Sequence, residues 1–226
     1  MDKYILFDLD GTISESSKGI TKSVKYCLES VNIYENDLKK LEMFIGPPLN
    51  VAFKEVYGLN SKEISLALSN FRDYYEEKGM FECNLYKGIN NLLKACHEEG
   101  MHLAVASSKP VEHVRAIINH FKLTPLFDFI GGSDIKDELE NKTTKNNKEI
   151  VIRNALENLK INTKTSNLSI TMVGDRKFDI AGGRANKIKT IGVSYGYGSK
   201  EELQKAGADK IVSTVCELQK ELLNKD

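Results

Sequence analysis

The sequence predicts an α/β fold in which a parallel sheet is sandwiched between helices, with an all-helical segment inserted after the first strand. Three observations predict it: apolar runs of strand length recur along the chain, most lead into stretches with helical spacing, and residues 14–83 interrupt this alternation. Strands that alternate with helices are typical of parallel sheets, because each crossover helix packs back onto a face of the sheet.

The predicted strands are apolar throughout, as expected of strands that are buried on both faces. Each ends in a polar or glycine-rich turn, and they cover residues 4–7, 103–106, 127–130, 170–173, 190–193 and 210–212. The helical spacing of apolar residues predicts helices at residues 88–99, 111–121, 149–159 and 201–206.

Residues 14–83 contain no convincing strand, but two of their stretches have the spacing of amphipathic helices. The first runs from Ile20 to Val31 and the second from Ile64 to Tyr75, with Ser61 as the predicted N-cap of the second. We therefore predict two parts, a core made of residues 1–13 and 84–226 and a helical insert made of residues 14–83.

The composition argues against several classes of protein. Lys and Arg number 32 and so do Asp and Glu, so the formal net charge is zero, whereas nucleic-acid binding normally needs a basic excess. The four cysteines form no C-x-x-C pair, which argues against a zinc site or a disulfide framework. No apolar run is long enough to span a bilayer, and the first is too short for a signal peptide. We expect a cytoplasmic protein, a monomer or weak dimer, that binds neither nucleic acid nor membranes.

The clearest chemical signal is the segment from Asp8 to Thr12, Asp-Leu-Asp-Gly-Thr, directly after the first predicted strand. Ligands of parallel sheets usually bind beyond the carboxyl ends of the strands, where two nearby carboxylates can point into one crevice. Phosphoryl transfer to a carboxylate needs an ionised nucleophile and a neighbouring acid for the leaving oxygen, and Asp8 and Asp10 can divide these roles. Gly11 permits a sharp turn. The alternative is a simple acidic turn.

A second acidic signal, Gly174 to Asp179, follows the predicted strand at residues 170–173. An anionic nucleophile and an anionic phosphate repel each other, and a divalent cation between them removes this repulsion. Magnesium prefers oxygen ligands, so we expect Asp175 to complete a Mg²⁺ site with Asp8. Asp179 is equally compatible with the plain role of an acid at a helix N-terminus.

A phosphate-binding signal ends the strand at residues 103–106. Ser107 can donate a hydrogen bond to a phosphate oxygen, and so can the amides of the following turn. The segment Ser107 to Pro110 is also compatible with a plain helix start. The cations available for the remaining phosphate oxygens are Lys109, Lys142, Lys145 and Lys148.

In their order along the chain these segments resemble the motifs of the haloacid dehalogenase (HAD) superfamily: an acidic D-x-D, a Ser or Thr, a Lys and a G-D-x-x-x-D. The resemblance covers essentially the whole chain and implies a Rossmann-like catalytic core, with residues 14–83 as a C1-type helical cap over the active site. Residues 44–49 and 191–198 are most similar to phosphoglycolate-phosphatase-like and bacterial 5′-nucleotidase-like members.

The resemblance implies a Mg²⁺-dependent phosphatase that acts on a small-molecule phosphate ester. Asp8 would form a phosphoaspartate, and Asp10 would act as the acid and then as the base for the attacking water. Mg²⁺ would be bound by the side chains of Asp8 and Asp175 and by the backbone carbonyl of Asp10. Asp179 would lie in the outer shell or hold the lysine. Phosphate or substrate contacts are expected from Gly11, Thr12, Ser107, Ser108, Gly46 and Pro47.

The lysine of the third motif is expected to be Lys148, because it opens the helical pattern at residues 149–159. Many relatives have Lys-Pro here, whereas this chain has Lys148-Glu149 after a longer polar stretch, so Lys145 stays an alternative. A phosphomutase would share these motifs, and a non-catalytic binding protein on this fold would be expected to lack a catalytic carboxylate. Dehalogenation is disfavoured because it needs neither Asp10 nor a metal ligand at Asp175.

The composition of the insert suggests the kind of leaving group. Between Glu15 and Glu82 there are nine Lys and Arg against eleven Asp and Glu, and Arg72 is the only arginine. Residues 44–49 are uncharged, with one aromatic ring and two prolines that suit an apolar or stacking contact. The alternatives are that Phe44 and Leu49 only pack between helices of the insert, and that Lys39, Lys40 or Lys54 reaches a carboxylate. Because a carboxylate would need a cationic partner, ideally Arg, we expect 5′-nucleotides to be preferred to phosphoglycolate.

Overall fold

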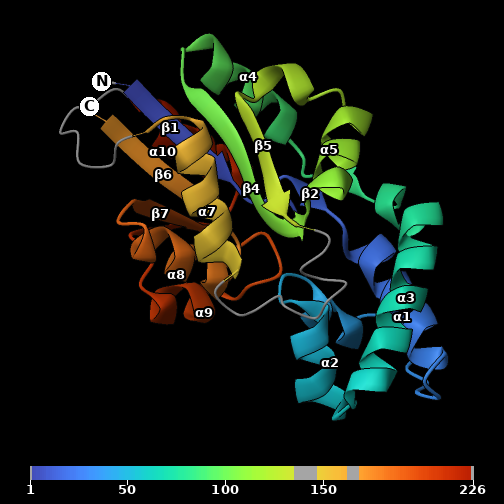
Figure 1. Cartoon of the computed structure of the whole chain (residues 1–226). Coiled ribbons are helices and arrows are strands. Elements are labelled where there is room, and N and C mark those ends of the chain that lie inside the picture. The colour runs from blue at the N-terminus through green and yellow to red at the C-terminus, as the bar shows by residue number, and fades with distance from the viewer. Residues whose placement is uncertain (1, 135–146, 162–167, 225–226) are drawn as a thin grey trace.

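The α/β sandwich predicted from the sequence is confirmed. The computed structural model describes residues 2–134, 147–161 and 168–224, in which six parallel strands form one sheet of order β5-β4-β1-β6-β7-β8 (Figure 1). The strands are β1 (Asp2–Phe7), β4 (His102–Pro110), β5 (Phe129–Ser133), β6 (Leu168–Gly174), β7 (Lys189–Val193) and β8 (Lys210–Val212). β1 therefore lies inside the sheet, between β4 and β6.

The register of the central strands brings their carboxyl ends to one edge of the sheet. Phe7 pairs with Val105 of β4 and with Val173 of β6, all in parallel. Each strand then reaches a polar residue within two positions. The residues that share this edge are Asp8, Ser107 and Asp175.

Helices cover both faces of the sheet. The side chains of β1 alternate between two apolar clusters, with Ile5 and Phe7 in one and Leu6 in the other. The first cluster includes residues of α4 (Ile89–Glu98), α5 (Val111–His120) and α10 (Val215–Leu223), and the second includes residues of α7 (Asn147–Asn158). α8 (Lys177–Ala185) packs against α7, β6 and β7, and α9 (Lys200–Ala206) packs against α8 and β8.

The insert after the first strand is mainly helical. It contains α1 (Ser17–Glu29), η1 (Lys40–Phe44), α2 (Leu49–Tyr57), α3 (Ser61–Glu77) and η2 (Gly79–Phe81). α1 and α3 pack against each other and bury Val24, Leu28 and Leu68. Figure 1 shows these helices beyond the carboxyl ends of β4 and β5. The division into two domains at residues 14 and 83 stays a prediction.

The prediction that residues 14–83 contain no strand is wrong at one end. β2 (Ser14–Glu15) pairs antiparallel with β3 (Asn84–Leu85), so the chain leaves and re-enters the core through two adjacent strands. A two-residue strand is too short for a periodic pattern to reveal it.

Several boundaries differ from the sequence predictions, and two of the differences have a cause in side-chain hydrogen bonds. The N-cap of α3 is Asn60 and not Ser61, because the Asn60 side chain accepts hydrogen bonds from two backbone amides and Glu63 bonds back to it. β5 begins two residues later than predicted, because the carboxylate of Asp128 accepts the amide of Leu103 at 3.1 Å in place of a backbone carbonyl. A 3-10 turn, η3 (Thr124–Leu126), precedes it. Within the described ranges, no helix is both long and apolar enough to cross a membrane.

Candidate active site

Asp8 lies directly beyond β1 and is almost completely buried. Its side-chain Oδ1 accepts a hydrogen bond from Nζ of Lys148 at 2.7 Å, and its amide donates to the carbonyl of Val173 at 2.9 Å. Burial raises the pKa of Asp8 to about 6, because removal from water disfavours the charged form more than the attraction of Lys148 favours it. A carboxylate held in this way is fixed in place by the strand behind it and the lysine beside it.

Lys148 occupies the second position of α7 and reaches across the sheet edge. Its Nζ lies 2.7 Å from Oδ1 of Asp8 and 2.8 Å from Oδ1 of Asp179, and it donates to the carbonyl of Ala106 at 3.0 Å. Burial by itself would lower the pKa of Lys148, but the two carboxylates outweigh it and raise that pKa. The alternative lysine, Lys145, lies outside the described residues, so the choice between the two stays a prediction.

The nucleophile candidate, Asp8, belongs to a cluster of three buried carboxylates. One oxygen each of Asp8, Asp175 and Asp179 lie within 4.8 Å of one another. Asp175 follows β6, and its Oδ2 accepts the amide of Tyr197 at 2.7 Å, whereas its buried Oδ1 has no hydrogen-bond partner in the described part of the chain. Burial and the neighbouring Asp179 and Asp8 raise the pKa of Asp175 well above its ordinary value. An unpaired oxygen among hard oxygen donors fits a divalent cation.

Asp179 has both of the roles that the sequence allowed. It is the third residue of α8, where its Oδ2 accepts the amide of Arg176 at 3.0 Å, as an acid at a helix N-terminus does. Its other oxygen makes the ion pair with Lys148. The acid that starts α8 therefore also orients the lysine.

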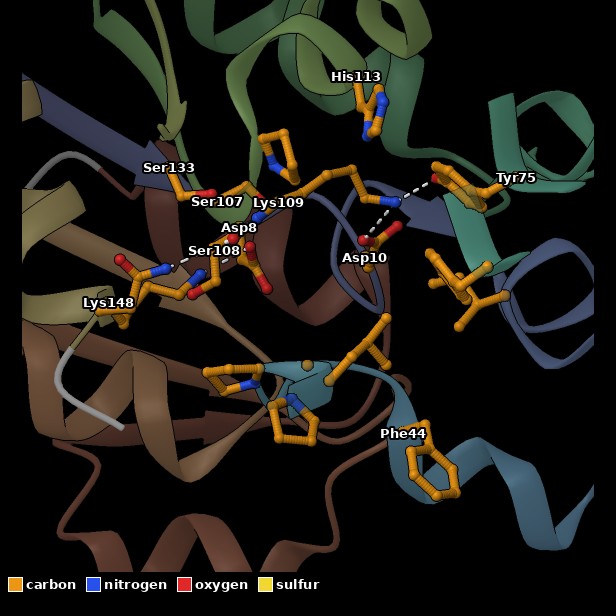
Figure 2. Close-up of a pocket in the computed structure, with 18 of the residues that line it drawn as sticks. Asp8, Asp10, Phe44, Tyr75, Ser107, Ser108, Lys109, His113, Ser133 and Lys148 are labelled. Atoms are coloured by element: carbon orange, nitrogen blue, oxygen red, sulfur yellow. Dashed lines mark hydrogen bonds and ion pairs between the residues drawn. The ribbon is translucent and has the colours of Figure 1, made fainter. Parts of the chain in front are cut away.

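A pocket opens between the sheet edge and the insert, and encloses about 810 Å³ including the space at its mouth. Figure 2 shows side chains from both parts around it. The core contributes Asp8, Asp10, Ser107, Ser108, Lys109, Pro110, His113, Ser133, Asn147 and Lys148. The insert contributes Ile20, Phe44, Gly46, Pro47, Pro48, Leu49, Phe71, Arg72 and Tyr75. The structure thus brings together seven of the residues expected from the sequence: Asp8, Asp10, Ser107, Ser108, Gly46, Pro47 and Lys148.

Gly11 and Thr12 do not line this pocket. Gly11 has a φ of +84°, and a Cβ added there would lie 2.2 Å from Oδ2 of Asp175, so glycine is required by both the turn and the close carboxylate. Thr12 is fully buried, and its carbonyl accepts a hydrogen bond from the hydroxyl of Tyr195. This geometry gives no support to the phosphate contacts predicted for Gly11 and Thr12. Both residues lie outside the pocket lining, Gly11 against the carboxylate of Asp175 and Thr12 against the hydroxyl of Tyr195.

The two serines lie at the end of an extended strand. β4 continues to Pro110, which is the N-cap of α5, so the helix begins one residue after the Ser-Ser-Lys-Pro segment. Ser107 is buried, and its Oγ accepts the amide of Lys109 at 3.3 Å. Its hydroxyl hydrogen stays available to a ligand in the pocket.

Lys109 is the most important residue that sequence reasoning left undecided. Its Nζ lies 3.0 Å from Oδ2 of Asp10 and donates a hydrogen bond to the hydroxyl of Tyr75, as the dashed lines in Figure 2 show. Burial opposes the charge of Lys109, but Asp10 and Tyr75 outweigh it and raise its pKa. Burial also raises the pKa of Tyr75 to about 12. Alternation along the strand could not place Lys109, because the pairing of β4 with β5 changes register between Ala106 and Pro110.

Three other pocket residues were not anticipated. His113 is buried in the pocket wall, and its Nε2 lies 3.1 Å from Oε1 of Glu76. Burial lowers the pKa of His113. Ser133 ends β5 at the same sheet edge as Asp8, which could have revealed it. Two buried atoms of the pocket, Oγ of Ser133 and Nη1 of Arg72, have no hydrogen-bond partner among the described residues.

This arrangement can hold an anionic group against a buried carboxylate. Lys148 lies beside Asp8, while Lys109 and the hydroxyl of Ser107 line the same pocket. The cluster of Asp8, Asp175 and Asp179 suits a cation. Asp10 lines the same pocket two residues from Asp8, so a second carboxyl group can exchange a proton with the bound molecule.

Comparison with known proteins agrees with this geometry. A sequence model of the family described as "Haloacid dehalogenase-like hydrolase" matches residues 5–193. A crystal structure of a predicted phosphatase from Clostridium acetobutylicum superimposes with a TM-score of 0.90 and 45% identity, over 99% of each chain.

Curated relatives have several names. The chain is 38% identical over 200 residues to a 5′-nucleotidase of Pseudomonas aeruginosa, which covers 88% of this chain and 86% of that protein. It is 30% identical over 225 residues to the tyrosine-protein kinase PtkA of Mycobacterium tuberculosis, covering 97% and 72%. It is 25% identical over 225 residues to a phosphoglycolate phosphatase of Colwellia psychrerythraea, covering 96% and 95%.

Proposed function

The chain belongs to the haloacid dehalogenase-like hydrolases and is a phosphatase, and from this premise we propose that it is a Mg²⁺-dependent phosphomonoester hydrolase with an aspartyl-phosphate intermediate. The observation that carries the proposal is the position of Asp8. This carboxylate is buried at the end of β1 and faces the pocket. It accepts a hydrogen bond from Lys148 and is one of the three carboxylates of the cluster.

In the first step, a carboxylate oxygen of Asp8 attacks phosphorus, and the bond from phosphorus to the ester oxygen breaks. The carboxyl group of Asp10 gives its proton to that leaving oxygen and becomes a carboxylate. In the second step, the Asp10 carboxylate takes a proton from a water molecule, whose oxygen attacks phosphorus and releases phosphate and free Asp8. One residue can do both because it lines the same pocket as Asp8.

The neighbouring side chains stabilise the charge that moves in these steps. Lys148 and the hydroxyl of Ser107 lie where they can bind the phosphate oxygens, and Ser108 lines the same wall. Asp8 and Asp175, with the carbonyl of Asp10, would hold Mg²⁺, and Asp179 would keep Lys148 oriented. When bound, Mg²⁺ would offset the repulsion between the carboxylate and the phosphate. Residues 14–83 would act as the cap over this site.

The first candidate substrate is a nucleoside 5′-monophosphate. The insert lines the pocket with Pro47 and Leu49, whereas the ring of Phe44, which borders the same pocket, is buried and packs against Phe53 and Tyr57. The apolar surface of Pro47 and Leu49 suits an uncharged leaving group. The name of the Pseudomonas relative supports this choice.

The second candidate is phosphoglycolate, and the observation that favours it is Arg72. The composition of the insert suggested no cationic partner for a carboxylate. In the structure, however, the side chain of Arg72 lines the pocket, and its buried Nη1 has no hydrogen-bond partner among the described residues. A guanidinium binds a carboxylate through paired donors.

One experiment tests the proposal directly. Release of phosphate is measured for nucleoside monophosphates, sugar phosphates, phosphoglycolate and p-nitrophenyl phosphate, with Mg²⁺ and with EDTA, and acid-quenched protein is analysed by mass spectrometry. We expect turnover only with the metal and a phosphoryl group on Asp8. A phosphoryl group on another residue, or full activity in EDTA, would contradict the proposal.

A further inference from the structure

We propose that Lys109 and Tyr75 are positioning residues, through which the position of the Asp10 carboxyl group depends on the position of helix α3. This inference rests on the acid–base role proposed for Asp10. It assigns to the insert a part in the chemical step, in addition to any contact with the leaving group.

The contacts form a continuous chain from the sheet edge to the insert. Nζ of Lys109 lies 3.0 Å from Oδ2 of Asp10, and the side chains of this pair are only 9% and 11% exposed. The same Nζ donates to the hydroxyl of Tyr75 and lies 4.4 Å from the centre of its ring. Figure 2 shows Lys109 extended between the two partners, Asp10 below it and Tyr75 to its side. One ammonium group therefore bridges a core carboxylate and a residue of α3.

The other oxygen of Asp10 also depends on the insert. Its Oδ1 accepts a hydrogen bond from the hydroxyl of Ser14 at a long 3.5 Å, and Ser14 begins β2, where the chain leaves the core. This bond is weak at that length, so Lys109 is the stronger of the two restraints. One oxygen of Asp10 is thus bonded to Ser14 at the start of the insert, and the other to Lys109, a core residue that contacts the insert through Tyr75.

Tyr75 is itself held firmly. Its ring stacks on Phe71 at 5.3 Å and packs against His113 at 5.5 Å, while the next residue of α3, Glu76, lies 3.1 Å from Nε2 of His113. Two adjacent residues of α3 therefore contact the core: Tyr75 binds Lys109, and Glu76 binds His113 in the first turn of α5. If α3 moves away from α5, both contacts are lost together, and Lys109 keeps only Asp10.

The consequence for catalysis follows from geometry. Asp10 must pass a proton to the leaving oxygen and later take one from water, and such transfers need heavy atoms within hydrogen-bond distance. Without its contact to Tyr75, Lys109 can change position and displace the carboxyl group of Asp10. Small displacements of a catalytic group lower reaction rates strongly. Lys109 keeps its own protons in both steps. The simpler alternative is that Lys109 binds the phosphate directly, since it also lines the pocket.

The first test compares Tyr75→Phe with the control Tyr74→Phe. Phe keeps the ring over Lys109 and removes only the hydroxyl. Tyr74 is the preceding residue of the same helix, and its ring packs at a tilt against Tyr26, with centroids 5.5 Å apart, outside the pocket. For an alkyl phosphate, whose leaving oxygen needs a proton, we expect Tyr75→Phe to lower kcat about tenfold, the effect of one lost hydrogen bond. Phosphorylation by p-nitrophenyl phosphate, measured as the burst rate, should stay within about twofold. Tyr74→Phe should change neither.

The second test separates positioning from phosphate binding. Lys109→Met should reduce the rate with the alkyl phosphate more than the burst rate with p-nitrophenyl phosphate, and should add almost nothing in the Asp10→Asn background. If its effect is equal for both leaving groups and adds fully to Asp10→Asn, Lys109 binds phosphate and the inference is overturned. If Asp10→Asn alone shows no dependence on the leaving group, the acid role itself fails, and the proposed function must be revised at that point.

Discussion

The two walls of the pocket differ in how their charges are balanced. On the sheet side, each charged side chain that lines the described pocket has a charged partner, with Lys148 against Asp8 and Lys109 against Asp10. On the insert side, the wall is apolar apart from Arg72 and the hydroxyl of Tyr75, and Arg72 has no ion pair among the described residues. A wall whose charges are paired suits the transfer of the phosphoryl group, which is the same for all phosphate esters, because its charged groups are fixed in position before the substrate binds. An unbalanced wall suits discrimination between leaving groups.

This comparison makes a general prediction. Changes on the sheet side should lower the rate for every substrate by a similar factor, whereas changes on the insert side should reorder the substrates. Lys109 and Tyr75 are the exception, because their contact crosses the boundary between the walls.

The largest effect is expected from Asp8→Asn. The amide is nearly isosteric with the carboxylate but cannot attack phosphorus, and the uncatalysed reaction is among the slowest known, so turnover should fall by many orders of magnitude for all substrates. Steady-state phosphate release measures this, with circular dichroism as the control for folding. A folded variant that retains more than about a few per cent of activity would assign the nucleophile elsewhere.

The next largest effect is expected from Lys148→Ala. Removing a fixed donor to transferring oxygens lowers kcat by about 10²–10³-fold in comparable sites, and the loss should be similar for nucleotides and phosphoglycolate. The matched variant is Lys145→Ala, which we expect to change kcat/KM far less. A larger loss from Lys145→Ala would transfer the role of the third-motif lysine to that residue.

A smaller effect, on stability, is expected from the metal. Binding of Mg²⁺ should relieve the repulsion among Asp8, Asp175 and Asp179, and a concentration about a hundredfold above Kd should raise Tm by roughly 5–10 °C. Asp175→Asn should reduce this shift strongly, and the apo variant should be no less stable than the apo wild type, because one buried charge is gone. Differential scanning fluorimetry with and without EDTA measures both. An unchanged shift in the variant would argue against Asp175 as a ligand.

The sequence predicted the sheet wall better than the insert wall, for a physical reason. Parallel strands present their carboxyl ends at one edge, so strand prediction alone placed Asp8, Ser107 and Asp175 together. Tyr75 and His113 meet only because α3 packs onto α5, and helical spacing shows which face is apolar but not which helix it will contact. The same limit hid Arg72, whose neighbour in sequence, Phe71, follows the apolar pattern.

Gly11 shows a different limit of the sequence. The resemblance implied a phosphate contact for Gly11, whereas in the structure it is the carboxylate of Asp175 that lies close to its backbone. That carboxylate comes from a segment more than a hundred residues away, so only the packing of β1 beside β6 could reveal the contact. Asn60 and Asp128 moved element boundaries by one or two residues through side-chain hydrogen bonds, which spacing does not encode.

The smallest and most selective effect is expected from Arg72→Gln on the insert wall. The buried Nη1 of Arg72 lacks a partner in the described structure, so a substrate carboxylate would gain a charge-assisted bond there. Loss of such a bond should lower kcat/KM for phosphoglycolate by roughly 10–100-fold, and for nucleoside monophosphates, whose leaving group is neutral, by less than about threefold. 2-Hydroxyethyl phosphate has the same carbon skeleton without the carboxylate and should behave like the nucleotides.

Arg153→Gln is the matched control, since Arg153 is an exposed arginine of α7 that lies 4.0 Å from Glu149. It should leave all three substrates unchanged. If Arg72→Gln lowered kcat/KM equally for phosphoglycolate, 2-hydroxyethyl phosphate and the nucleotides, Arg72 would act on the phosphoryl group common to them. Arg72 would then affect all substrates equally, as the residues of the sheet wall are expected to do. Discrimination between substrates would have to come from the apolar residues of the insert wall.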